Sequence, residues 1–495
     1  MTRITEYITG VALWFVILIY IVIPLSPILI VLLILRKSEQ VIWRNLYGWE
    51  AVKTSDMVWL DDLPKNRAIV NCVIVLNGRV PLDDLKSILK NRLVRATTED
   101  GQLRYPNATN TVKSGYFNYF WVKDTSFLID NHVDVINVGS DINDIEDLQI
   151  SLGGVVSSNF RRGDIPPWEV LVVRCVLSGG EKTVLIWRSH HCLADGSSLV
   201  YFLTSVIPDQ QASTPTKRFA HKNVVLSSKL HLEISQRRLL TLKGMILFPL
   251  QVVKMTFLTN TDTSVLHAPD VSGNKLVVWS SKIDFNKIRK LRKKLNVSIN
   301  DILMSALSLT FHDYFVSEDM YLPDNVLVSF PVDTRDHQNS CGVFTNEFAV
   351  QQLSLPTKSG DFQQLLVETE KRINCIKFSG EPFACRNLIL IAGGLMPELV
   401  RRPMFDMFCK KTSAVVTSVQ STDKKLSIGG AEIDHVTFWS PQRANIGLSF
   451  SFFTYNDTLV FSAEADNRVT CNVQKIVKQF EQTLNKILEM DFGKQ

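Results

Sequence analysis

The pattern of hydrophobic and polar positions sets the first 40 residues apart from the rest of the chain. Residues 8–35 are uncharged and almost wholly apolar, and basic residues stand on both sides of them. This run predicts a membrane-embedded segment, and it is too long, with no cleavage site after it, for a signal peptide. Fully helical, it would be about 42 Å long against about 30 Å of hydrocarbon. A single kinked span and a hairpin that turns at Pro24 and Pro27 both fit this pattern.

Beyond residue 40, short apolar runs with the spacing of buried strands are mixed with amphipathic helices. Strands are predicted at residues 68–76, 169–177, 183–189, 325–332, 347–353, 446–454 and 458–463. Helices are predicted at residues 82–93, 142–159, 285–295, 302–315 and 473–488. Turn residues at 178–182 and at Asn456-Asp457 predict two hairpins. Without strict strand–helix–strand alternation, this mixture indicates an α/β fold of the layered α+β kind.

The length of 495 residues is too great for one ordinary domain, so we expect two. A polar stretch at 209–222 predicts a linker or exposed loop. The apolar positions of 239–258 recur at helical spacing, which fits either an interdomain core helix or an interfacial helix on a membrane. The expected parts are a membrane anchor at 1–40, an N-terminal lobe at 41–225, an interdomain segment at 226–270 and a C-terminal lobe at 271–495.

Composition narrows the choice of partners. The net charge is only +5, and a dense basic stripe with interleaved aromatic residues is missing, which argues against nucleic acid. The eight cysteines are scattered without a C-x-x-C pair. This spacing argues against a zinc module or a dense disulfide framework, and it suits a reducing compartment.

Two adjacent histidines carry the clearest chemical signal in the sequence. His190 and His191 follow the predicted strand at 183–189, and Asp195 and Gly196 come shortly after them. Because side chains alternate along a strand, only one of the two imidazoles can face a site, where it would suit general-base catalysis. The sequence has no G-x-S-x-G elbow, P-loop, G-x-G-x-x-G loop or H-E-x-x-H pair. Serine hydrolases, nucleotide-binding enzymes and zinc hydrolases are therefore disfavoured.

The stretch from His190 to Gly196 resembles the HHxxxDG motif of the bacterial-type wax ester synthase/diacylglycerol acyltransferase family, within the CoA-dependent acyltransferase superfamily. The resemblance continues from about residue 45 to the end. Further similar segments are 164–169, Asn300-Asp301, 330–335, 342–346, 355–356, Tyr455 and Ala465-Asp466. One departure is at 418–422, where Ser-Val-Gln-Ser-Thr stands in place of the N-V-P-G-P of many members. This departure puts the shape of that loop, and with it the choice of acceptor, in doubt.

The resemblance implies two chloramphenicol-acetyltransferase-like lobes with the catalytic motif between them. Within the motif formed by His190, His191, Asp195 and Gly196, it selects His191 as the general base. It implies that Asp195 holds the loop through an ion pair with an arginine, and that Gly196 lets the backbone turn closely.

Two further pairs of residues are expected near this motif. Arg104 or Arg95 is the expected ion-pair partner of Asp195. The oxyanion that forms during acyl transfer needs hydrogen-bond donors, for which a backbone N–H near Gly196 and the side chain of Asn300, with Asp301 beside it, are expected.

The implied activity is transfer of a fatty acyl group from acyl-CoA, as co-substrate, to a long-chain alcohol or diacylglycerol. The products would be wax esters or triacylglycerols, and the chemistry needs no metal or other cofactor. Membrane lipid is the other expected partner, at the endoplasmic reticulum with the catalytic domain in the cytosol, or at a lipid droplet or the plasma membrane. Two alternatives remain: a catalytically silent lipid-binding or transfer protein on the same fold, favoured by the departure at 418–422, and a structural lipid-droplet protein.

Overall fold

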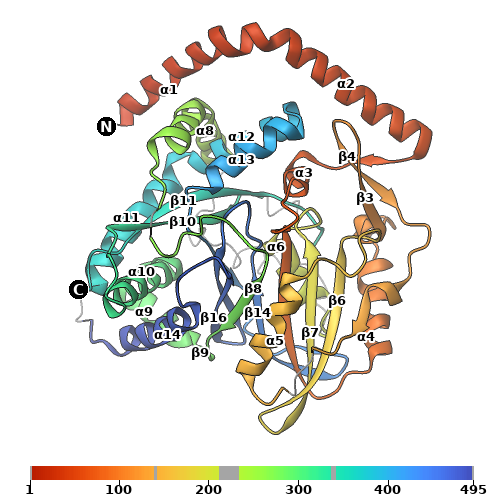
Figure 1. Ribbon diagram of the computed structural model, residues 1–495, viewed down its shortest axis with the longest axis vertical. Coiled ribbons are helices and arrows are strands. Elements are labelled where there is room, and N and C mark those ends of the chain that lie inside the picture. Colours follow the sequence, from red (N-terminus) through yellow and green to blue (C-terminus); the bar gives the residue numbers. More distant parts are fainter. Residues whose placement is uncertain (1–2, 139–141, 211–233, 263, 336–341, 493–495) are drawn as a thin grey trace.

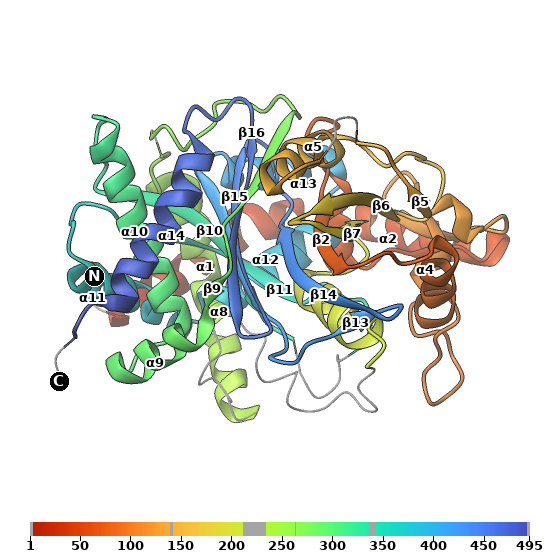
Figure 2. The same cartoon turned by 90° about the horizontal axis from the view of Figure 1, so that it is seen from below.

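A computed structural model of the chain describes residues 3–138, 142–210, 234–262, 264–335 and 342–492. Two large β-sheets lie side by side, each packed against helices, and a long N-terminal helix arches over one end of the molecule (Figures 1 and 2). The expected mixed α/β fold in two lobes is confirmed.

The first lobe is built on a six-stranded sheet in the order β13-β14-β2-β7-β6-β5. Its central hairpin, β6–β7, is antiparallel from Trp168 opposite Ser189 to Leu177 opposite Gly180. Ser178 and Gly179 close this hairpin with φ angles of 52° and 76°, as a two-residue type I′ turn requires. The strands are β2 (Ile69–Asn77), β5 (Val133–Val135), β6 (Trp168–Leu177), β7 (Gly180–His190), β13 (Ser427–Ile428) and β14 (Ala431–Trp439).

The second lobe is built on a seven-stranded sheet in the order β11-β10-β12-β15-β16-β8, with β9 paired to β16. The predicted turn at Asn456 and Asp457 joins β15 to β16, and both residues have positive φ angles, 47° and 57°. Strand β12 is parallel to both of its neighbours. The strands are β8 (Lys275–Trp279), β9 (Ile283–Asp284), β10 (Asn325–Asp333), β11 (Phe348–Pro356), β12 (Ala414–Gln420), β15 (Leu448–Tyr455) and β16 (Thr458–Asp466).

One hairpin of the C-terminal half crosses into the first lobe. Strand β14 pairs antiparallel with β2, from Glu432 opposite Asn77 to Trp439 opposite Asn71, with a register shift between Ile433 and His435. The predicted division into lobes at 41–225 and 271–495 therefore does not separate the two sheets. This crossing was not predicted, because pairing between strands so far apart in the chain leaves no local pattern.

Helices and a small sheet complete both lobes. Strands β1 (Glu50–Ala51), β4 (Tyr119–Lys123) and β3 (Asn110–Ser114) form the small sheet, next to the end of the N-terminal helix (Figure 1). The helices of the first lobe are α3 (Thr54–Leu60), α4 (Leu82–Leu89) with the π-helical turn η2 (Lys90–Val94), α5 (Ile145–Ser157), and α6 (Gly196–Tyr201) with η5 (Phe202–Val206). Those of the second lobe are α9 (Phe285–Leu295), α10 (Ile299–Ser317), α11 (Phe362–Ser379), α12 (Glu381–Leu395), α13 (Glu398–Cys409) and α14 (Val473–Glu489).

The helices predicted with a clear apolar face are present near their expected bounds, α9 at 285–295 among them. Helix α10 begins after Ser298, and Ser298 and Asp301 form a reciprocal capping box. The elements not predicted are helices α3, α6, α11, α12 and α13 and strands β1, β3, β4, β5, β8, β9, β12, β13 and β14. The apolar residues of α12 occur all round the helix, so no single face stands out in its sequence.

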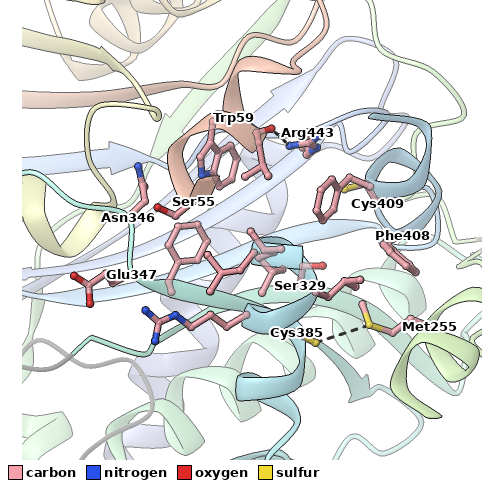
Figure 3. A pocket seen from close by; sticks show the side chains of 18 of the residues that line it. Ser55, Trp59, Met255, Ser329, Asn346, Glu347, Cys385, Phe408, Cys409 and Arg443 are labelled. Carbon is pink, nitrogen blue, oxygen red and sulfur yellow. Dashed lines mark hydrogen bonds between the residues drawn. The ribbon is translucent and has the colours of Figure 1, made fainter. Parts of the chain in front are cut away.

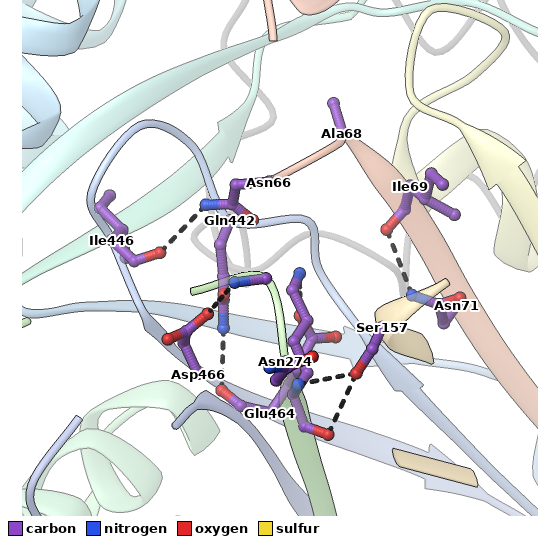
Figure 4. A network of polar contacts seen from close by, with 12 residues as sticks. Asn66, Ala68, Ile69, Asn71, Ser157, Asn274, Gln442, Ile446, Glu464 and Asp466 are labelled. Atoms are coloured by element: carbon purple, nitrogen blue, oxygen red, sulfur yellow. Dashed lines mark hydrogen bonds and ion pairs between the residues drawn. The ribbon is translucent and has the colours of Figure 1, made fainter. Parts of the chain in front are cut away.

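Polar contacts join the lobes beside β8. Gln442 donates to the Glu464 carbonyl at 2.9 Å, and Asn66 donates to the Ile446 carbonyl at 3.3 Å (Figure 4). Helix α5 of the first lobe packs against β8 of the second. Gly153 permits this packing, because a Cβ at its position would lie 2.9 Å from the Lys275 carbonyl oxygen.

The N-terminal apolar run is one continuous helix, made of α1 (Arg3–Ile17), the π-helical turn η1 (Leu18–Val22) and α2 (Ile23–Tyr47). The chain does not reverse at Pro24 or Pro27, as the hairpin interpretation required. The second apolar segment forms α8 (Ile234–Val253), continued by η6 (Lys254–Leu258), and packs against α1 and α12. Most of the predicted linker at 209–222 lies outside the described residues.

Within the described residues, two helical stretches have the length and composition to cross a membrane: Ile4–Tyr47 and Arg238–Leu258.

Candidate active site

The two histidines lie where strand β7 ends against the other lobe. His190 is the last residue of β7, and His191 begins the turn that leads to α6. The backbone N–H of His191 donates to the Ala68 carbonyl at 2.7 Å, which fixes the start of this turn against β2. Both imidazoles are buried, with 7% of each residue exposed.

His190 is bound on both ring nitrogens within the first lobe. Its Nδ1 accepts from the backbone N–H of Cys192 at 3.2 Å. The proton is therefore on Nε2, which lies 3.1 Å from Asp62 Oδ2 and donates to it. With both nitrogens occupied, His190 supports the turn and has no free nitrogen for a substrate.

His191 is oriented by a residue of the other half of the chain. Its Nδ1 lies 3.0 Å from Asn346 Oδ1, while Asn346 Nδ2 donates to Asp56 at 3.0 Å and to the His191 carbonyl at 2.8 Å. An amide oxygen only accepts, so Nδ1 of His191 carries the proton and Nε2 carries the lone pair. Among the described residues, none donates a hydrogen bond to Nε2.

Aromatic rings fix the plane of this imidazole. Trp59 of α3 stacks on His191 with ring centroids 3.9 Å apart and planes inclined by 19°. Phe348, the first residue of β11, lies 5.5 Å from the imidazole centroid on the lobe interface. The two aromatic side chains come from different lobes, so the imidazole orientation depends on the lobes being packed together.

Cavities lie on both sides of the site. The larger, about 360 Å³, is lined by Trp59, Asn346 and Phe348 near His191 and by residues of η6, α12 and α13 at its other end (Figure 3). Its lining is mostly apolar, and its volume is in the range of small-molecule sites. The smaller, about 70 Å³, is lined by His191, Asp195 and Gly196. Phe348 lines both cavities, whereas His191 lines the smaller one and contacts the larger one only through its neighbours Trp59, Asn346 and Phe348.

Asp195 braces the turn between the lobes. One of its oxygens accepts from the Ser198 N–H at 2.9 Å as the cap of α6, and the other accepts from the Glu347 N–H at 3.0 Å and from Arg335. Burial by itself would raise the pKa of Asp195, but Arg335 and these backbone donors outweigh it and hold the pKa below its usual value. Asp195 is therefore ionised, and its hydrogen bonds and ion pair hold the turn in place.

The expected arginine partners of Asp195 were wrong. Arg335 follows β10 of the second lobe and makes the ion pair, whereas Arg95 follows η2 and Arg104 lies near Gly342. Asp195 faces the lobe interface, so its partner comes from the opposite lobe. The signal was present in the sequence, because Arg335 ends the segment 330–335 that resembles the family pattern.

Asn300 and Asp301 lie in the first turn of α10. Asp301 completes the capping box, and Asn300 Oδ1 accepts from Ser418 at 3.0 Å. Among the described residues, neither lines a cavity beside His191. Ser418 itself is part of strand β12, so the departure at 418–422 begins within the sheet and not in a loop.

Burial sets the protonation states in the site. Burial lowers the pKa of His191 to about 4, against which the charge of Asp195 acts only partly. Burial also raises the pKa of Asp56 to about 6. At neutral pH the imidazole is therefore uncharged and able to accept a proton.

A neutral, oriented histidine buried between two α/β lobes, beside two cavities, defines a two-lobed enzyme of the CoA-dependent acyltransferase type. Family models agree: residues 84–303 match the wax ester synthase/diacylglycerol acyltransferase catalytic domain, and residues 344–488 match the WS/DGAT C-terminal domain. The chain belongs to the wax ester synthase/diacylglycerol acyltransferase family and is an acyl-CoA-dependent O-acyltransferase.

Individual relatives are distant in sequence. A probable diacylglycerol O-acyltransferase of Mycobacterium tuberculosis is 20% identical over 387 residues, which cover 74% of this chain and 81% of the relative. The wax ester synthase/diacylglycerol acyltransferase structure from Marinobacter aquaeolei covers 89% of this chain and 98% of its own, with a TM-score of 0.58 and 16% identity. The starter condensation domain of rhizomide synthetase, solved with C8-CoA, covers 89% of this chain and 94% of its own, with a TM-score of 0.53 and 10% identity. At these identities the two structures establish the shared fold.

Proposed function

We propose that this enzyme transfers a fatty acyl group from acyl-CoA to the hydroxyl of a long-chain alcohol or diacylglycerol, with His191 as the general base. The observation that carries this proposal is the contact between His191 Nδ1 and Asn346 Oδ1 at 3.0 Å. It leaves the lone pair on Nε2 of an imidazole that lines the smaller cavity and packs against residues of the larger one.

The proposed reaction moves one proton and exchanges one bond. Nε2 of His191 takes the hydroxyl proton as the acceptor oxygen attacks the thioester carbonyl carbon. The tetrahedral oxyanion accepts from backbone N–H groups at Gly196 and Ser197, which line the smaller cavity. When the carbon–sulfur bond breaks, the imidazolium returns the proton to the leaving CoA sulfur, so neither a metal nor another cofactor takes part.

The larger cavity fits a lipid acceptor or the acyl chain. Its lining includes the apolar side chains Val58, Trp59, Phe348, Val350, Leu388, Ile389, Phe405 and Phe408. Exclusion of water from such a site matters, because water would compete as acyl acceptor. The condensation domain solved with C8-CoA supports binding of an acyl-CoA on this fold.

The proposed location is a membrane, because acceptor and product are nearly insoluble in water. The N-terminal helix supports it: its most apolar 18-residue window has a mean hydropathy of 3.0 and is 0% buried. The endoplasmic reticulum, with the catalytic lobes in the cytosol, is the proposed compartment, and a lipid droplet or the plasma membrane is the alternative.

The test compares substitutions of the two adjacent histidines in an assay for free CoA. His191→Ala should lower kcat by about 100- to 10,000-fold, the usual contribution of a general base, without loss of folding by circular dichroism. His190→Gln is the matched control, because its amide keeps a donor toward Asp62, and its activity should remain within about tenfold of the unsubstituted enzyme. Near-normal activity of a folded His191→Ala protein would refute the assignment.

A further inference from the structure

We propose that the helix Arg3–Tyr47 is an in-plane membrane anchor that enters one leaflet as an arch and does not cross the bilayer. Both of its ends make docking contacts with the same globular body, and its most apolar window is without protein contacts that bury it. The anchor holds the mouth of the larger cavity against the lipid. The route of the acceptor rests on the acyl transfer proposed above, whereas the placement of the helix does not.

The N-terminal end of the arch docks on α8. Trp14 Nε1 donates to the Met245 carbonyl at 2.8 Å, and its ring stacks on Phe248 with centroids 5.8 Å apart. Gly10 allows the two backbones to touch, since a Cβ there would lie 2.6 Å from the Ile246 carbonyl oxygen. One turn earlier, Glu6 pairs with Lys254 at 3.0 Å. These contacts hold α1 along α8.

The C-terminal end of the arch docks on the first lobe and on α12 of the second through a buried polar cluster. Arg36 is 8% exposed, and its guanidinium donates to Asn118 at 2.8 Å and to the Gly393 carbonyl of α12 at 2.5 Å. Glu39 accepts from the N–H of Phe117 at 3.0 Å and from Asn118 at 2.7 Å. Buried charges satisfied in this way are costly to expose singly, so this end is firmly held.

The middle of the arch has the properties of a segment in hydrocarbon. No charged residue occurs from 7 to 35, and large apolar side chains such as Phe15, Ile19 and Ile28 are exposed. Pro27 has no N–H for the Ile23 carbonyl, and Ser26 Oγ donates to that carbonyl at 2.7 Å instead. A backbone satisfied within its own segment is what a lipid environment demands.

The bend of the arch has local causes. The π-helical turn at Leu18–Val22 and Pro27 lie between the docked ends, and both features bend helices. The ribbon is convex away from the body (Figure 1). The residues from Trp14 to Arg36 make about 33 Å of helix, enough to span a bilayer. A span, however, would put Trp14 and Arg36 on opposite faces and break one of the two docking contacts.

The surface beneath the arch also carries exposed apolar side chains. Helices α8, α12 and α13 lie there (Figure 1). Their exposed apolar side chains are Leu239, Leu242, Met245, Leu390, Ile391, Leu399, Val400 and Met407. Helices α12 and α13 also line the cavity that leads to Trp59 and Asn346. An acceptor dissolved in the leaflet would thus reach the site without passing through water.

The placement of the helix is tested with the full chain in sealed vesicles of phosphatidylcholine and dioleoylglycerol. One epitope tag is placed before Met1 and a second after Gln495, and protease is added from outside. The in-plane anchor predicts that both tags are lost together from the same population of molecules. Protection of the N-terminal tag in molecules that lose the C-terminal one, relieved only by detergent, would overturn the proposal.

The lipid contact is tested with a charge on the surface beneath the arch. Leu399→Asp changes a residue that is 86% exposed on α13. CoA release with dioleoylglycerol in vesicles should fall by about tenfold, the effect of a charge placed in lipid, while release with a short, water-soluble alcohol stays unchanged. Val176→Asp is the matched control: it is 56% exposed beside the β6–β7 turn, which lies at the far end of the molecule from the arch (Figure 1).

The outcomes separate this inference from the proposed function. Equal rates of Leu399→Asp and Val176→Asp with vesicle-held acceptor would overturn the lipid contact, as would an equal loss on both acceptors. Unsubstituted enzyme that released no CoA with either acceptor would refute the proposed acyl transfer, and the epitope tags would still decide where the helix lies.

Discussion

At the scale of single residues, one amide determines which nitrogen of His191 is available. Asn346 is fixed from the other side by Asp56 and by the His191 carbonyl, so its oxygen must face Nδ1. Strand alternation had already distinguished the two histidines in the sequence. What the sequence did not reveal was that the orienting group comes from residue 346, although the segment 342–346 was noted for its resemblance.

Removal of this amide should affect the chemical step through His191 alone. We expect Asn346→Ala to lower kcat by about 100-fold, within the range that a general base contributes, and to leave KM nearly unchanged. In a His191→Ala background the same substitution should cause no further loss of kcat, because the imidazole that Asn346 orients is then missing. Steady-state kinetics of the single and double variants measure both effects. Additive losses would mean that Asn346 acts on the substrate or the fold instead.

The buried histidine also predicts the pH profile. Because the pKa of His191 is lowered to about 4, the imidazole stays neutral down to that pH, and kcat/KM should fall near pH 4 and not near 6.5. The same shift affects folding stability. The unfolded chain binds this proton below pH 6.5, whereas the folded chain binds it only near pH 4. The stability is therefore full above pH 6.5 and is lost as the pH falls toward 4. Rates are therefore compared only where circular dichroism reports folded protein. Burial raises the pKa of Asp56 to about 6. Any inflection of kcat/KM near pH 6 should therefore be absent from the Asp56→Asn enzyme.

At the scale of elements, two adjacent glycines of α5 have different surroundings. Gly153 lies against the Lys275 carbonyl of β8, while a Cβ at Gly154 would meet nothing within 4 Å. Both sit in the interior of a predicted helix, where glycine is normally unfavourable. The packing of α5 on the second lobe explains Gly153, because a side chain there would collide with β8.

Leucine substitutions at Gly153 and Gly154 form a matched pair that tests this difference in surroundings. Gly153→Leu should lower the free energy of unfolding by about 1–3 kcal/mol, because the added side chain must push α5 away from β8. Gly154→Leu should leave the free energy of unfolding unchanged or raise it by up to about 1 kcal/mol, the difference in helix propensity. Urea titrations followed by circular dichroism give both values. Similar values for the two variants would mean that α5 does not pack tightly on β8.

At the scale of the whole molecule, the ion pair of Asp195 with Arg335 joins the lobes at the active-site turn. Their side chains are 6% and 7% exposed, so neither charge has water to replace its partner. The same turn carries His191, and its imidazole is held by Asn346 and Phe348 of the other half. Stability and catalysis are therefore coupled at this junction.

Loss of the charge on Asp195 should therefore lower both the folding stability and the rate of acyl transfer. We expect Asp195→Asn to lower the free energy of unfolding by about 3 kcal/mol, as removal of one partner of a buried pair does, and to slow acyl transfer. The exposed pair Lys65–Asp270, whose side chains are 60% and 62% exposed, supplies the control: Asp270→Asn should leave unfolding unchanged. An Asp195→Asn enzyme of normal stability but low rate would indicate a direct chemical role for Asp195.

Part of the site was readable from the sequence because it is local. The strand, the turn and the spacing from His190 to Gly196 lie within one short segment, and the alternation of side chains follows from that strand. Arg335, Asp56, Trp59 and Asn346 reach the site from distant segments. The expected partners Arg104 and Arg95, chosen by resemblance, were wrong for that reason, since the partner that crosses the interface is Arg335 of the other lobe.

The sequence by itself determined the mixed α/β class, seven of the sixteen strands in the described residues, the main amphipathic helices, two hairpin turns and the apolar N-terminal segment, because each depends on neighbouring residues. Tertiary structure alone decided the crossing of β14 into the first sheet, the docking of both ends of the long helix on one body, and the lone pair on Nε2 of His191. The physical reason is common to all three. Each is fixed by contacts between segments far apart in the chain, whose free energy depends on packing and burial that a linear pattern does not record.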